Sequence, residues 1–354
     1  MNDKVTMKSI AKELGISINA VSLALNNRVG VSDETRIKVL QAANRLGYIS
    51  NNSRFSQTFR RFNFCIMIQD IYSRDMDFYG KLLFFAVQEF KKNGYDTILN
   101  YFSDTHMAIP DCVENRRVSG ILIIGKISDE NVKMLQAFTM PLVIIDHEPL
   151  SSSANCVMSD SKSGGVLATN YLINCGYEEI GFFGDLEYSL PIRDRYFGFL
   201  WALKKKGITE NGNQDNYVKK YSITGSVEQH VLNNDIDAIA RIVSAHETLP
   251  KSYLCSNDNA TFALIAALRE NGIRVPDDIS VVGFDNIELC EKTVPKLTTI
   301  NVNKEVMGQK AVQRLLHLLE HKNEINEKIV LGVELVERAS VLPFRAPKIQ
   351  VKKH

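Results

Sequence analysis

Apolar residues in the first 50 positions recur at intervals of three and four, which is the spacing of short amphipathic helices. Three such segments follow one another, and a residue that favours a helix boundary stands beside each: Gly15 after the first, Ser17 before the second and Ser32 before the third. Three short helices with a glycine turn between the first two predict a helix-turn-helix unit. The expected inward-facing residues are Ile10, Ala11, Leu14, Val21, Ala24, Leu25, Ile37, Leu40, Ala43 and Leu46.

From residue 62 onward the pattern changes to short apolar runs separated by amphipathic stretches. Such runs are typical of strands in parallel sheets that helices cover on both faces. These runs are more strands than one sheet easily accommodates, so we expect an α/β body of two lobes, each a doubly wound parallel sheet. The expected strands are 62–68, 95–102, 120–125, 141–146, 179–184, 252–257 and 279–285, and the expected helices include 79–94, 163–176, 194–207 and 260–272.

Charge is unevenly distributed between these two parts. The formal net charge of the 354 residues is +1, but residues 1–61 hold ten Lys or Arg against four Asp or Glu. A head of charge +6 on a body of charge −5 indicates a polyanion partner for the head alone. Ordinary surface scatter is the alternative explanation. The composition, 45% hydrophobic and 23% charged, is that of a globular protein.

The cysteines and the apolar runs predict the cellular compartment of the protein. The six cysteines are scattered singly without a CxxC spacing, which is typical of buried free thiols in a reducing compartment. The N-terminal segment has no apolar signal-peptide core, and no run approaches membrane-spanning length. We therefore expect a cytoplasmic protein that makes no contact with a membrane.

The second predicted helix carries side chains suited to reading DNA. The major groove admits one helix, and the first residues of that helix meet the base edges. Asn19 can form two hydrogen bonds with an adenine, whereas Ile18 and Ala20 offer apolar contacts, for example to a thymine methyl group. The alternative is a three-helix docking domain with a polar surface. Short polar groups suited to phosphate oxygens are Thr6, Ser17, Ser22 and Asn26.

Polar side chains also follow the predicted strands of the body. In open parallel sheets, ligands bind beyond the carboxyl ends of the strands. Carboxylates and amides there can hold sugar hydroxyl groups, although each alone is more often a helix cap or a turn residue. Phe78 and Tyr79 offer an aromatic face for a sugar ring, or else pack in the core. The strand-end residues are Asp70, Asp146, Asn257, Asp258 and Asp285.

Residues 5–51 resemble the DNA-binding headpiece of the LacI/GalR family of bacterial transcriptional regulators. Family members usually have VSxxTVSRxLN where this chain has ISINAVSLALN, so Leu23 takes the place of the usual arginine and Ala20 that of the usual threonine. The resemblance implies a homodimer on double-stranded operator DNA, with Leu23 among the residues that face the bases. Base contacts should then be more apolar and less directed to guanine. No leucine heptad follows residue 345, which favours a dimer over a tetramer.

The family has a hinge segment after the third helix, with an apolar residue, often leucine, that wedges into the minor groove. The corresponding stretch here is SNNSRFSQTFRR, residues 50–61, in which Gln57 takes the position of the leucine. Phe55 or Phe59 could supply the wedge instead. The alternatives are phosphate contacts through Arg54 and the two arginines that end the stretch, or a solvated basic linker.

The body resembles the effector-binding domain of the same family, which shares its fold with periplasmic sugar-binding proteins. The resemblance is strongest over residues 272–308, and RYFGF corresponds to the family's RxxGY, which gives Arg195 the role of the sugar-contacting arginine. The stretch DIYSRDMDFY replaces the family's shorter DxxNPFF, so the rim of the first lobe should differ. By the same resemblance, Asp70, Asp146, Asn257 and Asp285 are effector contacts.

Signatures of common enzyme classes are missing: there is no GxSxG, HExxH, GxxxxGK[ST] or strand-linked GxGxxG. The seven histidines are widely dispersed, so we expect no metal cluster and no cofactor. The expected function is that of a sequence-specific repressor of carbohydrate-utilisation genes, controlled by a sugar or sugar phosphate bound between the lobes. The alternative is a regulator whose body chiefly binds a protein co-regulator or a purine-type corepressor.

The chain then divides into a helix-turn-helix headpiece (1–49), a hinge (50–61), a two-lobed effector-binding and dimerisation domain (62–345) and a C-terminal tail (346–354). Two headpieces must stand roughly 34–36 Å apart to reach both half-sites of a near-palindromic operator. A ligand that changes the angle between the lobes would change the spacing of the two hinges. Whether the ligand releases DNA or is required for DNA binding stays open.

Overall fold

The computed structural model describes residues 5–26, 28–46, 48, 63–209, 213–321 and 324–343. The expected hinge, with Arg54 and Gln57, lies outside the described residues, as does the expected tail at 346–354. All six cysteines are free thiols; five are buried and Cys175 is half-buried. Within the described ranges, no helix is both long and apolar enough to cross a membrane.

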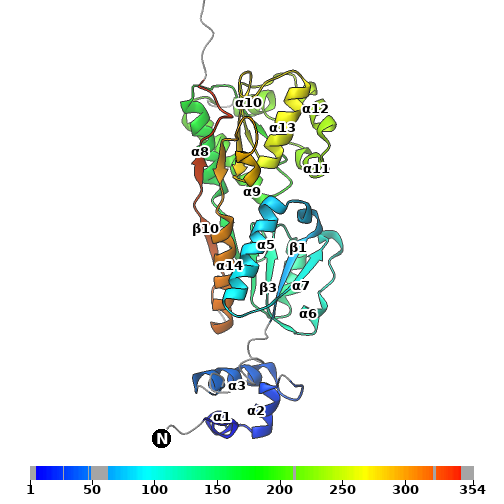
Figure 1. The fold of residues 1–354 in the computed structure, drawn as a ribbon, viewed down its shortest axis with the longest axis vertical. Helices are drawn as coiled ribbons and strands as arrows, with labels where there is room; N and C mark the ends of the chain where they lie inside the picture. The colour runs from blue at the N-terminus through cyan, green and yellow to red at the C-terminus, as the bar shows by residue number, and fades with distance from the viewer. Residues whose placement is uncertain are drawn as a thin grey trace, which may run out of the picture.

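Three helices form the N-terminal unit (Figure 1): α1 (Met7–Leu14), α2 (Ile18–Leu25) and α3 (Asp33–Arg45). Gly15 ends α1 in the left-handed conformation, with φ of 64°, which turns the chain tightly toward α2. Ser17 caps α2, because its Oγ accepts a hydrogen bond from the backbone N–H of Ala20 at 3.0 Å. Ser32 Oγ likewise accepts from the N–H of Thr35 at the start of α3. The predicted helix-turn-helix unit is thereby confirmed.

The core of this unit is small and apolar. Both α1 and α2 bury the residues predicted for them, except that Leu14 is only half-buried. The prediction for α3 was wrong in part, since Leu40 and Leu46 are half-buried while Val39 and Ala42 are buried together with Ala43. The buried strip differs because α3 packs against α1 and α2 at once, and small alanines let both neighbours approach closely.

The first lobe is built on a six-stranded sheet in the order β10-β5-β4-β3-β1-β2, in which every neighbouring pair is parallel. Helices α5 and α14 lie side by side along it (Figure 1). The strands are β1 (Asn63–Gln69), β2 (Thr97–Phe102), β3 (Val118–Ile124), β4 (Leu142–Ile145), β5 (Asn155–Ser159) and β10 (Lys328–Leu331). The helical elements are η1 (Asp70–Arg74), η2 (Met76–Gly80), α5 (Lys81–Lys92), η3 (Asp104–His106), α6 (Asp111–Glu114), α7 (Asp129–Gln136) and α14 (Lys304–Glu320).

The second lobe is built on a five-stranded sheet in the order β11-β9-β8-β7-β6, which is parallel except for the antiparallel edge strand β11. The strands are β6 (Ile180–Phe183), β7 (Ser252–Cys255), β8 (Ser280–Asp285), β9 (Thr299–Asn301) and β11 (Glu334–Val336). The helical elements are α8 (Ser161–Asn174), α9 (Leu190–Lys205), α10 (Gln214–Tyr221), α11 (Val227–Leu232), α12 (Ile236–Ala245), α13 (Asp258–Glu270) and η4 (Glu288–Glu291).

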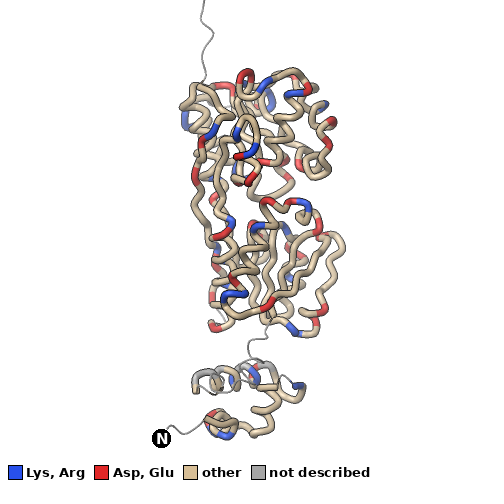
Figure 2. The backbone as a smooth tube through the Cα atoms, in the orientation of Figure 1, with Lys and Arg blue, Asp and Glu red and all other residues tan. Residues whose placement is uncertain are grey.

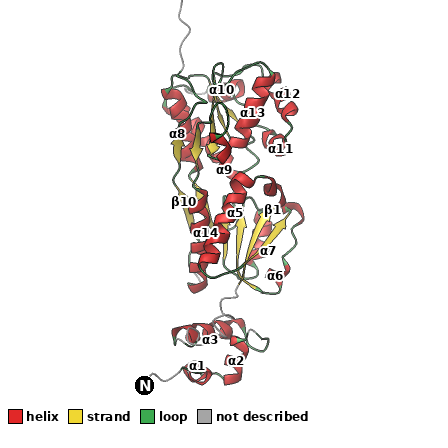
Figure 3. Ribbon diagram, viewed as in Figure 1, coloured by secondary structure: helices red, strands yellow, loops and turns green. Residues whose placement is uncertain are grey.

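The chain passes between the lobes three times, at residues 159–161, 301–304 and 331–334. The sheets occupy the middle of each lobe with helices around them (Figure 3), so the predicted pair of doubly wound sheets is confirmed. Lys and Arg are interspersed with Asp and Glu over both lobes (Figure 2). Sequence patterns missed four strands, β5, β9, β10 and β11; β9 and β11 have only three residues each, and β10 and β11 are partly exposed.

Candidate functional site

The first turn of α2 presents an exposed and uncharged surface. Ile18 is 48% exposed although it is apolar, and Asn19 beside it is exposed as well. Val21, Ala24 and Leu25 on the opposite side fill the core, so the orientation of the helix is determined by packing. The hydroxyl hydrogen of Ser17 stays available to an outside acceptor because the capping bond uses only its oxygen. Ala20, Ser22 and Leu23 are half-buried, and Thr6 and Asn26 are exposed.

Arg36 of α3 holds the end of α2 in place. Its guanidinium donates to the carbonyl oxygens of Leu23 and Ala24, both at 3.3 Å, and of Arg28 at 2.7 Å. Leu23 and Ala24 lie in the last turn of α2, where carbonyl oxygens lack the usual partner four residues further along the helix, and Arg28 lies in the loop beyond it. Sequence reasoning missed this role, because nothing in the spacing of Arg36 relates it to residues 23–28.

The side chain of Leu23 lies against the loop after α2. A Cβ atom placed on Gly30 would come within 3.1 Å of Leu23 Cδ1, and Gly30 itself has a φ of 119° that favours glycine. The loop therefore closes over one side of Leu23, which is only half-exposed. Two further predicted DNA contacts, Arg54 and Gln57, lie outside the described residues.

A second candidate site lies between the lobes, where strands of both sheets end. Side chains from η1, η2 and the end of β4 face it from the first lobe, and side chains from α9, α11, α13 and the end of β8 face it from the second. The structure brings six of the eight predicted effector residues to its lining, and it leaves out Asp70 and Asp258. The six are Phe78, Tyr79, Asp146, Arg195, Asn257 and Asp285.

Arg195 and Asp285 form a buried ion pair in the wall of this cleft. Arg195 Nη2 donates to Asp285 Oδ1 at 3.0 Å, and its Nη1 donates to the carbonyl oxygen of Ser256. The guanidinium also stacks on the ring of Phe284, 3.8 Å from the centroid. Gly165 of α8 makes room for α9, since a Cβ there would lie 2.1 Å from the carbonyl oxygen of Arg195.

Asp146 faces the same cleft from the end of β4. Tyr79 donates its hydroxyl hydrogen to Asp146 Oδ2 at 3.0 Å, while Asp146 Oδ1 is buried with no protein partner. Arg195 Nε is likewise buried without a partner. Asp146 and Asp285 both adopt positive φ, 61° and 106°, which is uncommon for a residue other than glycine and is found at functional sites.

Carboxylates outnumber cations in the lining of the cleft. Burial raises the pKa of Asp146 to about 7 and that of Asp75 to about 6. Burial also raises the pKa of Asp285, and the neighbouring Arg195 opposes that shift. Lys304 lies behind the wall and is already bound to the carbonyl oxygens of Asp285 and Val302. A ligand in the cleft therefore meets three carboxyl groups, of which Asp146 is about half protonated near pH 7, and one guanidinium.

Asp258 and Asp70, the two predicted effector contacts outside the lining, lie elsewhere in the lobes. Asp258 is fully buried, where one carboxylate oxygen accepts from the Thr299 hydroxyl at 2.6 Å and the other from the N–H of Ile287 at 2.9 Å. It thus joins the loop after β8 to β9 inside the second lobe. Asp70 is exposed and begins η1, with its carbonyl oxygen bonded to the Ser73 hydroxyl.

Sequence reasoning missed several lining residues of the cleft. Tyr72 and Asp75 belong to the stretch DIYSRDMDFY, whose departure from the family pattern was the available signal. Tyr72 stacks on Tyr79 with ring centroids 4.0 Å apart. Tyr188 and Ser189 follow β6, so their position at a strand end could have indicated them as well.

The cleft is small, and direct bonds between the lobes surround it. The space open to the centre of a water molecule inside it is about 60 Å³, and one water needs about 10–15 Å³ by this measure, so several waters fit. Lys126 of the first lobe donates to the carbonyl oxygen of Tyr188 in the second at 3.1 Å. Arg74 donates to Asn233 at 3.4 Å, and Lys81 pairs with Glu288 at 3.7 Å. Any change of the angle between the lobes has to rearrange these bonds.

One group of possible metal ligands lies away from the cleft, on α14 and the residues after it. Two of the seven histidines, His317 and His321, are four residues apart and lie near Glu324. The expectation of dispersed histidines was wrong for this pair, and the spacing HxxxH in the sequence was the signal.

The chain is similar to known proteins over both of its parts. The family model described as bacterial regulatory proteins, lacI family, matches residues 6–51, and that of a periplasmic binding protein-like domain matches residues 169–341. The HTH-type transcriptional repressor PurR of Pasteurella multocida is 30% identical over 341 residues, which are 95% of this chain and 98% of the relative. The repressor of the same name from Haemophilus influenzae is 28% identical over 348 residues, 96% of each chain.

Solved structures show the same fold. The lac repressor dimer bound to operator and the anti-inducer ONPF has a TM-score of 0.65 at 22% identity, covering 96% of this chain and 100% of that one. A complex of the transcriptional regulator CelR with cellobiose has a TM-score of 0.65 at 21% identity, covering 95% and 99%. The similarity therefore includes the N-terminal helices as well as both lobes.

Proposed function

This chain belongs to the LacI family of bacterial regulatory proteins, and on that basis we propose that it is a homodimeric transcriptional repressor that a small molecule regulates. The observation that carries the proposal is the pairing of two features in one chain. An exposed, uncharged helix start in a helix-turn-helix unit is suited to base edges, and a cleft with unpaired buried polar groups separates two lobes. Its proposed partner, operator DNA, would place the protein in the cytoplasm.

The proposed DNA contact is made by the first turn of α2. In a helix-turn-helix unit the second helix enters the major groove with its first residues against the bases. Asn19 would pair with an adenine and Ile18 would meet a thymine methyl group. Thr6, Ser17, Ser22 and Asn26 would contact phosphates. Because Leu23 lies against Gly30 in place of the family's arginine, the half-site should be less rich in guanine contacts.

The proposed homodimer would use the edge of the first lobe. β2 is an edge strand, and its Leu99 and Tyr101 pair in register with Ile66 and Ile68 of β1, whose side chains pack under α5. Leu99 and Tyr101 therefore lie on the same face as α5, where they are 42% and 50% exposed, and Phe84 of α5 is 55% exposed. Exposed apolar side chains beside an open strand edge are features of an interaction surface.

The chemistry of the cleft favours an uncharged, hydroxyl-bearing effector such as a free sugar. A hydroxyl group can donate to Asp146 Oδ1 and accept from Arg195 Nε, the two buried atoms that lack protein partners. A phosphate would instead meet Asp75, Asp146 and Asp285 with only Arg195 Nε left to bind it, because the other guanidinium nitrogens and Lys304 are already engaged. The cleft thus argues against the sugar phosphate that the sequence left open. Purines and a protein co-regulator remain the alternatives.

Regulation would follow from the bonds that join the lobes. A ligand shifts a conformational equilibrium only through its different affinity for the two arrangements, and a hundredfold preference corresponds to about 2.7 kcal/mol. A sugar that enlarges the cleft must break or rearrange the contacts of Lys126 and Arg74 across it. The lobe angle, and with it the spacing of the two headpieces in the dimer, would change.

A gel shift tests this proposal directly. The full chain should bind the DNA upstream of its own gene at protein concentrations that leave a scrambled sequence of equal length unbound. A panel of free sugars, the matching sugar phosphates and purines is then added. A response to a free sugar without response to its phosphate is the expected result. A response to the phosphate, or to purines alone, would contradict the proposed effector class, and equal binding to scrambled DNA would contradict the repressor.

A further inference from the structure

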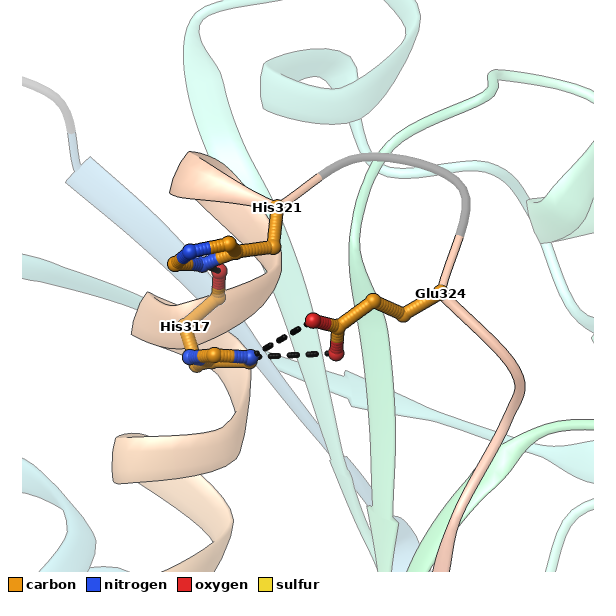
Figure 4. Close-up of side chains that lie close together, drawn as sticks. All are labelled: His317, His321 and Glu324. Carbon is orange, nitrogen blue, oxygen red and sulfur yellow. Dashed lines mark hydrogen bonds and ion pairs between the residues drawn. The ribbon is translucent and has the colours of Figure 1, made fainter.

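The last turns of α14 bring together three side chains that commonly bind metals. His317 lies in the last turn of α14, and His321, four residues on, directly follows the helix as its C-cap. Their rings lie 4.2 Å apart, centroid to centroid, and are nearly parallel at 18°. Glu324 faces them from the loop that follows, and His317 Nε2 lies 3.0 Å from each of its carboxylate oxygens (Figure 4). All three residues are exposed.

A neighbouring arginine fixes the position of Glu324 in this cluster. Arg314 Nη1 binds Glu324 Oε2 at 2.8 Å, and its Nη2 binds the carbonyl oxygen of Ile325 at 3.0 Å, so the carboxylate is fixed in place. Arg314 engages Oε2 alone, whereas both carboxylate oxygens face His317.

The tautomer of His321 is also determined by its contacts. His321 Nδ1 lies 3.2 Å from the carbonyl oxygen of His317, and a carbonyl can only accept, so Nδ1 carries the hydrogen. In the neutral ring Nε2 then holds the free lone pair. A bond from Nδ1–H to a backbone carbonyl is the usual outer contact of a metal-binding histidine, because it orients the ring and raises the basicity of the other nitrogen.

We propose that His317, His321 and Glu324 form a surface site for one divalent transition-metal ion, best matched by zinc. Two imidazoles and one carboxylate suit zinc, whereas magnesium and calcium prefer ligand sets made of oxygen alone. The ligand atoms lie within 4.8 Å of one another. Tetrahedral zinc bonds of about 2.0–2.2 Å would draw them to about 3.3–3.6 Å, a change within reach of exposed side chains, and a water would take the fourth position.

The position of the site indicates what the metal would stabilise. α14 packs on α5 and on strands β3, β4 and β5, and Leu315 approaches Gly120 together with Phe64 near the start of β1. Glu324 lies in the segment that leads into β10, which is paired with β5. Zinc would therefore tie the end of α14 to the edge of the sheet in the first lobe. This site is independent of the effector cleft and of the proposed repressor function.

Isothermal titration of the full chain with zinc chloride, after treatment with EDTA, tests the site. The chain should bind one zinc per protomer, and His317→Ala or His321→Ala should weaken binding by at least about tenfold. His230→Ala is the matched control, because His230 pairs with Asp235 outside the cluster, and it should bind zinc as the wild type does. No zinc binding by the wild type, or binding by both cluster variants as tight as that of the wild type, would overturn the proposal.

Thermal unfolding gives a second measure that does not depend on heat of binding. Zinc should raise the melting temperature of the wild type and of the His230→Ala variant, and leave the His317→Ala/His321→Ala double variant unchanged. Without metal all three should melt at similar temperatures, because the substituted side chains of the cluster are exposed. An equal rise in the double variant would assign zinc binding to other residues. Magnesium chloride should have no effect on any of them.

Discussion

Arg195 of α9 and Asp285 at the end of β8 pair at 3.0 Å inside the cleft, where both side chains are about nine-tenths buried or more. This ion pair joins two elements of the second lobe at the point where the first lobe faces it. The same guanidinium keeps one nitrogen, Nε, without a protein partner. The bond between Nη2 and Asp285 therefore stabilises the second lobe, while Nε of the same guanidinium is available to a ligand.

Removing one partner of this pair should destabilise the protein strongly. Arg195→Ala leaves Asp285 buried without its cation, and such changes cost about 3–5 kcal/mol. In the double variant Arg195→Ala/Asp285→Asn the uncompensated charge is gone, so the loss should be smaller than the sum of the two single losses. Urea unfolding of the wild type, Arg195→Ala, Asp285→Asn and the double variant measures this difference. Strictly additive losses would mean that the two side chains do not interact.

Unfolding measured against pH tests the environment of Asp146. Its pKa is about 7 in the folded chain and about 3.9 when unfolded, so between about pH 4 and 7 the folded chain holds a proton that the unfolded chain lacks. The contribution of this proton to the free energy of unfolding is present below pH 4 and is lost as pH rises, by at most about 1.4 kcal/mol per unit. Asp146→Asn should remove that slope. The pKa assigned to Asp146 would be contradicted if Asp146→Asn kept the pH slope of the wild type. It would also be contradicted if the exposed control Asp237→Asn lost the slope to the same extent.

Arg36 should be needed to position α2. Arg36→Ala removes three bonds to the carbonyl oxygens of residues 23, 24 and 28, and a hydrogen bond to a charged group contributes about 1.5–3 kcal/mol. Binding to operator DNA should fall well below that of Arg28→Ala, which loses the same charge from an exposed position. Filter binding at one salt concentration compares the two. Equal losses would indicate that only the charge matters.

The apolar edge of the first lobe should hold the dimer together. Leu99→Asp places a charge on the face that Phe84 and Tyr101 share, and sedimentation equilibrium should show a shift toward monomer. Leu150→Asp is a matched control, since Leu150 is 75% exposed in a loop after β4. A dimer that persists in Leu99→Asp and dissociates in the control would place the interface elsewhere.

Local sequence signals predicted the elements well and the long-range contacts poorly. Ser17, Gly15 and the apolar runs of β1 to β4 act within a few residues, so their effects are visible in the sequence. Asp258 shows what local signals cannot predict. A carboxylate at a strand end faces either the cleft or the loop after β8, and for Asp258 the hydrogen bond from Thr299, a residue far along the chain, selects the loop. The hydrogen bonds of Arg36 to α2 and the stacking of Tyr72 on Tyr79 likewise depend on tertiary contacts.

The most direct test of the account is the affinity of Asn19→Ala for operator and for non-specific DNA at the same salt concentration. A bidentate contact with one base contributes about 1–3 kcal/mol, so operator binding should weaken about 5- to 150-fold while non-specific binding stays nearly unchanged. Equal weakening on both DNAs, or none on either, would show that α2 does not read the bases as proposed.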